Sequence, residues 1–465
     1  MSTRIVVVGG GTAGARLAQR LPVTLLGEEP HAPYNRVLLA DVLAGRYEPE
    51  VIALPAPQEP VRRGVRAVRI DRAARIVECE DGTSVGYDRL VLATGSNPVL
   101  PPLRGLRGSR LPSGVHPFRT LDDCLELRAL VRPGVRAVVI GGGLLGVSAA
   151  RALAALGAEV VLTQQGERLM ERQLDEQASA LLRAHVESLG VEVHTECRVS
   201  GLRQEGGAVT AVELADGFVL DAQVVVLACG VRPRIGLARD AGLEVRTGIV
   251  VDDELRTSDP FIHAIGDCAE HDGRVYGLAG PALEQADALA GVLLTATADP
   301  APITTPVTAG PAPSTAGAAP DTAPDTAGTT EGPARVTAGA TEGPAPVTSG
   351  PAAVTAATAD AAPVTAGAPA YTGTRALTRL TLGGAESLDL AAFGEATPRP
   401  GDDVVQLTDA TRRAYRKVVV RGDRLVGGVL LGDLAAVGAL ARAWEGDEAL
   451  PHAPLLHLLT HDGGS

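Results

Sequence analysis

The chain has 465 residues and a formal net charge of −13, and only 2% of its residues are aromatic. This length is too great for one compact core and suggests roughly three domains. The acidic balance and the scarcity of aromatic side chains argue against a nucleic-acid-binding surface, which needs a basic stripe and stacking platforms. The apolar run at residues 5–8 is too short for a signal peptide or a membrane span, so we expect a cytoplasmic protein without membrane contact.

Residues 5–8 are also predicted to form a buried parallel strand, and they lead into the turn Gly9-Gly10-Gly11-Thr12-Ala13-Gly14. Gly9 would make the tight turn, Gly11 would let the backbone approach a pyrophosphate, and Gly14 would allow close packing of helix on strand. The helix is expected to begin near Thr12, where its unpaired N–H groups favour a bound phosphate. The turn therefore predicts a dinucleotide site that includes Thr12 and Ala13.

Three later segments are placed to complete this first site. A strand over 23–26 ends just before Glu28, an acid at the spacing where ribose hydroxyls are usually bound. A second buried strand leads into the small residues Ala93, Thr94 and Gly95, which let the backbone pass close to a nucleotide. A third strand, near residue 260, ends in Gly266-Asp267, and Asp267 could also cap a following helix.

The order of strand, glycine turn and helix is repeated further along the chain. A predicted strand over 135–140 precedes the turn 141–146, and a helix is expected over 147–156. The residues assigned to this second nucleotide site are Gly141, Gly143, Leu144, Leu145, Gly146 and, in a later strand-to-turn segment, Gly230. Two such turns in one chain indicate two bound dinucleotides.

The choice of nucleotide at the second site stays open on the sequence. The strand that follows the turn ends at Gln164-Gln165 without an acid. An NAD site usually has an acid at this position, and an NADP site has an arginine. Either glutamine could bind a ribose, and Arg168 or Arg172 could reach a phosphate, so both NADH and NADPH are considered, with a slight preference for NADH.

Together these segments resemble the two-dinucleotide-fold flavoprotein reductases, the superfamily of pyridine-nucleotide disulfide reductases and of rubredoxin and ferredoxin reductases. Within it, the chain is most similar to the N-terminal flavin module of NAD(P)H nitrite reductase large subunits and to assimilatory nitrate reductase electron transfer subunits. The resemblance is carried by residues 27–30, 33–39, 118–123, 169–175 and 277–286.

The resemblance implies an α/β fold with two Rossmann-like domains, for FAD and for NAD(P), and a small α+β C-terminal domain. It implies FAD at the first turn, with Glu28 on the adenosine ribose, Arg36 and Arg119 near the flavin or pyrophosphate, and Asp267 on the ribityl and phosphate portion. NADH or NADPH would bind at the second turn. Ferredoxin-reductase relatives have a lysine where this chain has Asp41, so Arg36 is expected to supply most of the local positive charge.

The five cysteines are scattered and include no Cys-x-x-Cys pair, which argues against a redox-active disulfide, an iron–sulfur cluster and a zinc site. Hydride transfer from nicotinamide to flavin is cofactor chemistry, so no catalytic residue and no metal ligand are assigned. By resemblance, complete nitrite reductases continue into cysteine-rich iron–sulfur and sirohaem regions that this chain lacks. Electrons are therefore expected to pass to a separate redox partner, such as a nitrate or nitrite reductase subunit, ferredoxin or rubredoxin.

Residues 296–370 consist mainly of Ala, Thr, Pro and Gly and predict a disordered linker, because they offer little apolar surface to bury. Strand patterns at 376–382, 417–420 and 424–431 and a helical pattern at 434–444 follow it. In the family such a domain packs on the flavin domain and often helps to form a homodimer. The expected limits are 1–120 with 250–295 for the FAD domain, 121–249 for the NAD(P) domain, 371–450 for the interface domain and 451–465 for a tail.

Three functions are compatible with these patterns. The first is an FAD-dependent NAD(P)H oxidoreductase that serves nitrite or nitrate assimilation, and the second is a ferredoxin or rubredoxin reductase. The third, from another class, is a non-catalytic redox sensor or scaffold that keeps the nucleotide folds. Intact glycines at both turns argue against the third.

Overall fold

A computed structural model describes residues 3–106, 110–296, 370–383, 387–409, 411–447, 449–450 and 454–459. The linker predicted over 296–370 lies outside the described residues except at its two ends, and so does most of the tail predicted over 451–465. The two blocks that flank this gap, 1–297 and 364–465, form one compact unit.

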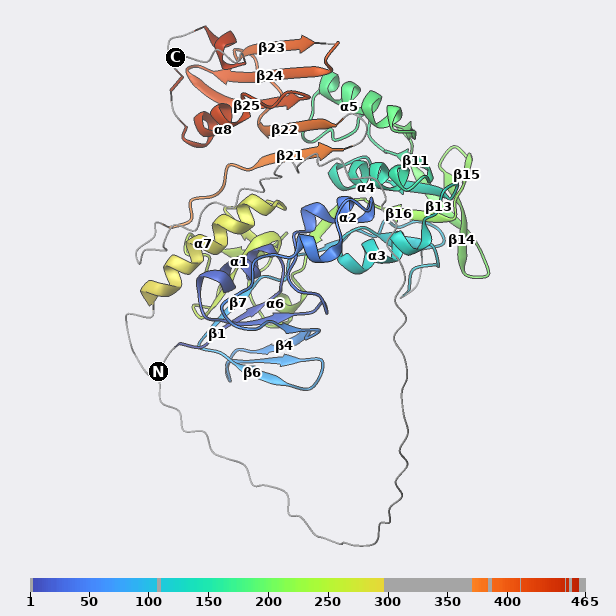
Figure 1. Cartoon of the computed structure of the whole chain (residues 1–465). Coiled ribbons are helices and arrows are strands. Elements are labelled where there is room, and N and C mark those ends of the chain that lie inside the picture. The colour runs from blue at the N-terminus through green and yellow to red at the C-terminus, as the bar shows by residue number, and fades with distance from the viewer. Residues whose placement is uncertain are drawn as a thin grey trace, which may run out of the picture. The chain divides into compact units, whose positions relative to one another are not determined.

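Two five-stranded parallel sheets organise the N-terminal part of this unit (Figure 1). The first has the order β3 (Arg62–Arg63), β2 (Thr24–Gly27), β1 (Ile5–Val8), β7 (Arg89–Leu92), β19 (Ile262–Ala264). The second has the order β12 (Val191–His194), β11 (Glu159–Thr163), β10 (Arg136–Ile140), β16 (Val224–Leu227), β9 (Val115–Pro117). The two orders coincide when β1 is matched to β10, so the repeat of the glycine turns is a repeat of the fold.

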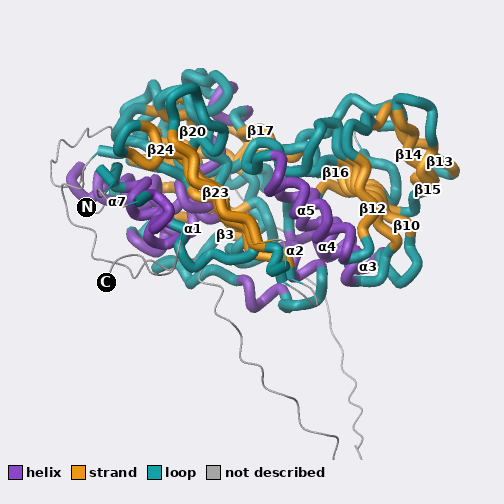
Figure 2. Tube along the Cα trace, turned by 90° about the horizontal axis from the view of Figure 1, so that it is seen from above, coloured by secondary structure: helices purple, strands orange, loops and turns teal. Residues whose placement is uncertain are grey.

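Each parallel sheet carries helices on its faces and a small antiparallel sheet before its fourth strand. In the first module α1 (Thr12–Arg20) packs against α7 (Ala279–Ala296), and in the second α4 (Leu144–Ala155) and α5 (Glu176–Ser188) lie beside the sheet with α3 (Leu121–Leu130) (Figure 2). The small sheets are β4 (Ala67–Asp71), β5 (Ile76–Cys79), β6 (Ser84–Gly86) and β13 (Val199–Glu205), β14 (Ala208–Leu214), β15 (Val219–Asp221). The central strands carry buried Val and Leu side chains, as expected for parallel sheets that are covered on both faces.

The chain crosses between the two modules twice, and the crossings are joined by an antiparallel pair, β8 (Ser96–Pro98) with β17 (Val231–Pro233). β9 already pairs with β16 of the second sheet, and Ala238 and Leu243 already pack in the core of the first. Both changes of module therefore lie earlier in the chain than residues 120 and 249, where the sequence suggested the domain limits.

Shorter elements connect these layers: η1 (Arg36–Leu38), α2 (Leu39–Leu43), η2 (Pro49–Ile52), α6 (Gly236–Asp240), β18 (Ile249–Val251), η3 (Gly266–Cys268) and β20 (Ala269–His271). They include the segments that carry Arg36 and Asp267.

The described C-terminal residues form an antiparallel sheet accompanied by helices, which confirms the predicted α+β domain. Its strands have the order β21 (Leu377–Leu382), β22 (Leu388–Gly394), β25 (Arg424–Leu431), β24 (Ala414–Arg421), β23 (Asp403–Asp409), with α8 (Val437–Glu445) and η4 (Leu455–Leu458). The sheet joins the second module through β21 beside α4 and β25 beside α5. Asp175 fixes this contact, because it accepts hydrogen bonds from the Tyr415 hydroxyl at 2.6 Å and from Lys417 at 2.8 Å.

Within the described residues no helix combines the length and the apolar character needed to cross a membrane.

Candidate nucleotide-binding site

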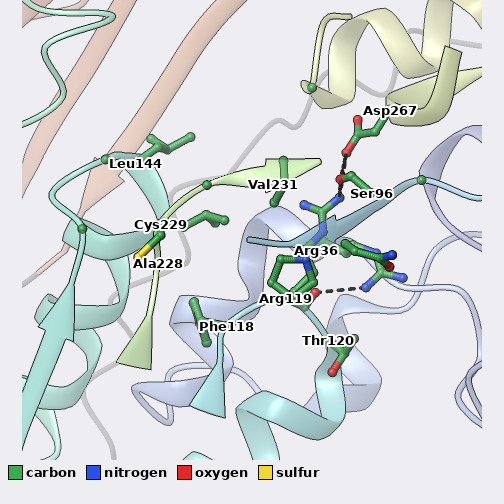
Figure 3. Close-up of a pocket in the computed structure, with 18 of the residues that line it drawn as sticks. Arg36, Ser96, Phe118, Arg119, Thr120, Leu144, Ala228, Cys229, Val231 and Asp267 are labelled. Atoms are coloured by element: carbon green, nitrogen blue, oxygen red, sulfur yellow. Dashed lines mark hydrogen bonds and ion pairs between the residues drawn. The ribbon is translucent and has the colours of Figure 1, made fainter. Parts of the chain in front are cut away.

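Both glycine turns open into one cavity of about 1650 Å³. The turns follow β1 and β10, so the cavity lies at the carboxyl ends of the parallel strands, where α/β sheets usually bind their ligands. Figure 3 shows side chains of both modules around it, with Arg119, Ser96 and Asp267 on one side and Leu144, Ala228 and Cys229 on the other. A ligand in this cavity would contact both modules at once.

The first glycine of each turn is required by the backbone. Gly9 and Gly141 have φ of 121° and 116°, and a Cβ there would lie 2.0 Å from the Ala93 carbonyl oxygen and 2.4 Å from that of Ala228. Any larger residue would therefore push apart the central strand and its neighbour.

The helices that follow the turns begin without a capping side chain. Gly11 is the N-cap of α1 and Gly143 that of α4, and neither has a side-chain cap, whereas α3 and α5 are capped by Thr120 and Asp175. A Cβ on Gly11 or Gly143 would meet nothing within 4 Å, so both helix ends are open to the cavity. Open helix N-termini bind phosphate through free N–H groups and the helix dipole, and the turns thus fit dinucleotides.

All of the predicted site residues line the cavity except the last glycine of each turn. A Cβ on Gly14 would lie 2.0 Å from the Gly9 oxygen, and one on Gly146 would lie 1.7 Å from the Gly141 oxygen. Their role is the close packing of helix on turn.

Arg119 and Asp267 form an ion pair at the wall of the first module (Figure 3). The Arg119 guanidinium donates to Asp267 at 2.6 Å and to the Ser96 hydroxyl at 2.7 Å, and Ser96 also lies 3.0 Å from the Asp267 carboxylate. Both charged side chains are less than one-fifth exposed. Ser96 was not predicted as a site residue, because its partners lie 23 and 171 residues away in the chain.

Arg36 also lines the cavity, but its charge is compensated. Its guanidinium forms a short ion pair with Glu29 and donates to the Tyr34 hydroxyl and to the Arg119 carbonyl oxygen at 2.9 and 3.0 Å. The expectation that Arg36 supplies most of the local positive charge is therefore not met, because Glu29 neutralises it. Asp41 faces Arg151 at 2.8 Å and does not line the cavity.

Glu28 lies at the cavity wall, where the ribose-binding acid was expected. Its carboxylate forms a short ion pair with Arg234 and a longer one with Arg66 at 3.6 Å. Arg234 was missed by the sequence reasoning, since it comes from the second crossing, 206 residues away. Binding of a ribose by Glu28 remains a prediction.

At the second turn Gln164 is already engaged, because its side-chain oxygen accepts the Gly142 N–H at 2.8 Å. Gln165 and Arg172 line the cavity, but Arg168 does not. Arg172 forms no ion pair with the described residues. This arrangement is compatible with either NADH or NADPH at the second turn.

The five cysteines are all described and all free. Cys197 and Cys229 line the cavity, and burial raises the pKa of both thiols, that of Cys229 to about 11. Both thiols therefore stay protonated near neutral pH, in line with the packing role expected for Cys229. Within the described residues no cluster of His, Cys, Asp or Glu is arranged to hold a metal ion.

The chain is similar to several reductases. The electron transfer subunit of the assimilatory nitrate reductase of Bacillus subtilis is 36% identical over 303 residues, 62% of this chain and 38% of that protein. A rubredoxin-NAD(+) reductase of Pseudomonas putida is 33% identical over 282 residues, 57% of this chain and 71% of that protein. The putidaredoxin reductase in a covalent complex with putidaredoxin shares the fold, with a TM-score of 0.73, 22% identity and 98% coverage of each chain.

Two family models also match. Residues 384–445 match the rubredoxin NAD+ reductase C-terminal domain. Residues 3–286, which contain both glycine turns and most of the cavity wall, match the pyridine nucleotide-disulphide oxidoreductase model. The chain therefore belongs to the pyridine nucleotide-disulphide oxidoreductase family.

Proposed function

We propose that this chain is an FAD-dependent NAD(P)H oxidoreductase that passes electrons to a separate protein acceptor in nitrate or nitrite reduction. FAD is assigned to the first glycine turn and NADH or NADPH to the second. The observation that carries the proposal is the pair of uncapped helix N-termini, at Gly11 and Gly143, that open into the same cavity.

The size of the cavity supports two ligands. Sites for a single small ligand measure about 300–1,000 Å³, whereas this cavity holds about 1650 Å³. Family membership implies the use of a flavin and a nicotinamide nucleotide. When bound, a flavin accepts a hydride from NAD(P)H and can release the electrons singly.

The residues of the chain bind and orient in this proposal, and no side chain is needed as an acid or a base. Ser96 and Arg119 hold the Asp267 carboxylate at the cavity wall, where it can accept hydrogen bonds from ligand hydroxyls. The protonated thiols of Cys197 and Cys229 are poor nucleophiles, so electrons are proposed to leave for an external acceptor without an internal disulfide step.

The acceptor is the part of the proposal that rests on relatives. The matched region spans 38% of the length of the Bacillus nitrate reductase subunit, so its role in nitrate reduction is extended to this chain only as a proposal. A rubredoxin or ferredoxin acceptor is the second candidate. It is favoured by the match of 384–445 to a rubredoxin reductase domain and by the 71% coverage of the Pseudomonas enzyme.

The test is an anaerobic titration of the FAD-loaded protein with NADH and, separately, NADPH. Loss of the flavin absorbance with at least one nucleotide is expected. A protein that binds FAD but is bleached by neither would refute the proposal. Re-oxidation by the host nitrate or nitrite reductase, compared with ferredoxin and rubredoxin, then separates the two acceptors.

A further inference from the structure

The first residues described after the gap at 297–369 pack into the first module. Tyr371 is only 6% exposed, and its backbone N–H donates to the Asp253 carbonyl oxygen at 2.7 Å. Its ring makes edge contacts with His271 and Tyr276, with ring centroids 4.9 and 6.4 Å apart. Tyr371 is therefore anchored in the same module as the first glycine turn, before the chain continues into β21.

A buried glutamine joins Tyr371 to the cavity. Gln285, in α7, is 1% exposed. Its side-chain oxygen accepts the Gly266 N–H at 2.7 Å, and its side-chain nitrogen donates to the Tyr371 hydroxyl at 3.3 Å. One amide thus bridges the backbone of the cavity wall to the segment that follows the gap.

The donor and the acceptor of each hydrogen bond in this series follow from the bond at the cavity end. The Gly266 N–H can only donate, so the Gln285 oxygen must face it and the Gln285 nitrogen must donate to Tyr371. Tyr371 then directs its own proton to the Thr374 hydroxyl at 2.7 Å, and Thr374 donates to the Glu284 carboxylate at 2.7 Å. The Tyr371 hydroxyl therefore accepts from the Gln285 amide in the same orientation that the Gly266 N–H requires, and supports it from the other end.

At the cavity end the bridge reaches the residues that shape the first site. A Cβ on Gly266 would lie 3.0 Å from the Ala13 Cβ, so the Gly266 turn touches the first turn of α1. The next residue, Asp267, holds the ion pair with Arg119. A shift of the Gly266 backbone would therefore displace both the helix end and the carboxylate that line the cavity.

We propose that Gln285 and Tyr371 are positioning residues for the bound flavin. Acting in series, they hold the Gly266–Asp267 turn in place, and they make the flavin site depend on the docking of the segment after the gap. This inference rests on the proposed function, because it assigns a flavin to the first turn.

The test compares FAD dissociation constants of the full chain and of three variants, measured by flavin fluorescence. Tyr371→Phe keeps the ring and removes the hydroxyl with its bonds to Gln285 and Thr374. Only the Gln285 bond leads to the cavity, so we expect the dissociation constant to rise about fivefold, the size of that one hydrogen bond. Gln285→Leu also leaves the Gly266 N–H unpaired, so a rise of about tenfold or more is expected. The double variant should equal Gln285→Leu, because the two residues act in series.

Tyr415→Phe is the matched control. It removes a buried tyrosine hydroxyl with one hydrogen bond, to Asp175, outside the cavity, and should leave the FAD dissociation constant unchanged. As a second readout, the reduction potential of the bound flavin should shift in Tyr371→Phe and stay constant in Tyr415→Phe.

An unchanged dissociation constant and potential in Tyr371→Phe would overturn the inference, and so would additive effects in the double variant. A full chain that binds no FAD would instead refute the proposed function, and this inference with it.

Discussion

Gly146, the last glycine of the second turn, offers the clearest test of whether a glycine serves packing or ligand binding. In a Gly146→Ala variant the new Cβ would start 1.7 Å from the Gly141 oxygen and 3.3 Å from the Ala228 Cβ. The nearest atom is backbone and cannot rotate away. Helix α4 must therefore move outward by more than about 1 Å before the contact is tolerable.

The cost can be estimated from the two opposing effects. Overpacking costs about 1–3 kcal/mol, and a backbone obstacle favours the upper end of this range. An alanine inside a helix returns about 1 kcal/mol relative to glycine. We therefore expect Gly146→Ala to lower the free energy of unfolding by about 2 kcal/mol, measured by urea denaturation of the full chain.

Gly143→Ala is the matched control. Its φ of −79° suits alanine, and the new Cβ meets nothing within 4 Å, so the free energy of unfolding should change by less than about 0.5 kcal/mol. The methyl group enters the space in front of α4, and NAD(P)H affinity should fall about tenfold or more. A Gly146→Ala protein as stable as the unaltered chain, or a Gly143→Ala protein with unchanged NAD(P)H affinity, would refute the assignment of roles.

Three further predictions concern charge and protonation. Asp175→Asn should lower the free energy of unfolding at pH 7 by about 1–3 kcal/mol, because it weakens the ion pair with the 9% exposed Lys417 side chain. Burial would raise the Asp175 pKa, but the hydrogen bonds from Lys417, Tyr415 and Ala178 outweigh it, and the pKa is lowered. The stabilisation is therefore present above the unfolded pKa and is lost as pH falls through the folded pKa. In urea titrations the free energies of unfolding of the variant and the unaltered chain should converge as pH falls below about 4. Alkylation of Cys229, followed by peptide mass spectrometry, should be slow at pH 7 and rise about tenfold per pH unit towards its pKa of about 11, and a flat profile would contradict the burial argument. Arg119→Met leaves Asp267 without its cation and should raise the FAD dissociation constant about tenfold to a hundredfold, and an unchanged constant would place this pair outside the site.

The glycine turns were predictable because their chemistry is local. The strand at 5–8 and the helix start at Thr12 appear in the structure as the sequence pattern predicts. The closest approach of Gly14 is to Gly9, a contact within the turn itself, so it can be predicted from the local spacing of the glycines.

The partners of the charged residues could not be predicted in the same way. Glu28 meets Arg234 only because β8 and β17 pair at the crossings, and Arg36 is neutralised by Glu29 through the fold of the loop between them. Gln285 reaches Tyr371 across 86 residues of chain. The hydrophobic periodicity of the sequence does not predict such contacts, because they arise from tertiary packing.

Two strands of the C-terminal sheet were also missed. β23 (Asp403–Asp409) is an edge strand with no buried residue, so its hydrophobic alternation is weak. β22 (Leu388–Gly394) contains the small residues Ala391 and Ala392, which pack in the interior but have low strand propensity.

The most direct test of the account is a crossed measurement of flavin reduction. Anaerobic stopped-flow traces are recorded for the FAD-loaded unaltered chain and for Gly11→Ala and Gly143→Ala, each mixed with NADH or NADPH. If the first turn holds FAD and the second holds the nicotinamide nucleotide, Gly11→Ala should lose flavin, whereas Gly143→Ala should keep it but need about tenfold more NAD(P)H for half-maximal reduction. Equal flavin loss in both variants, or a Gly143→Ala trace identical to that of the unaltered chain, would contradict two separate nucleotide sites facing one cavity.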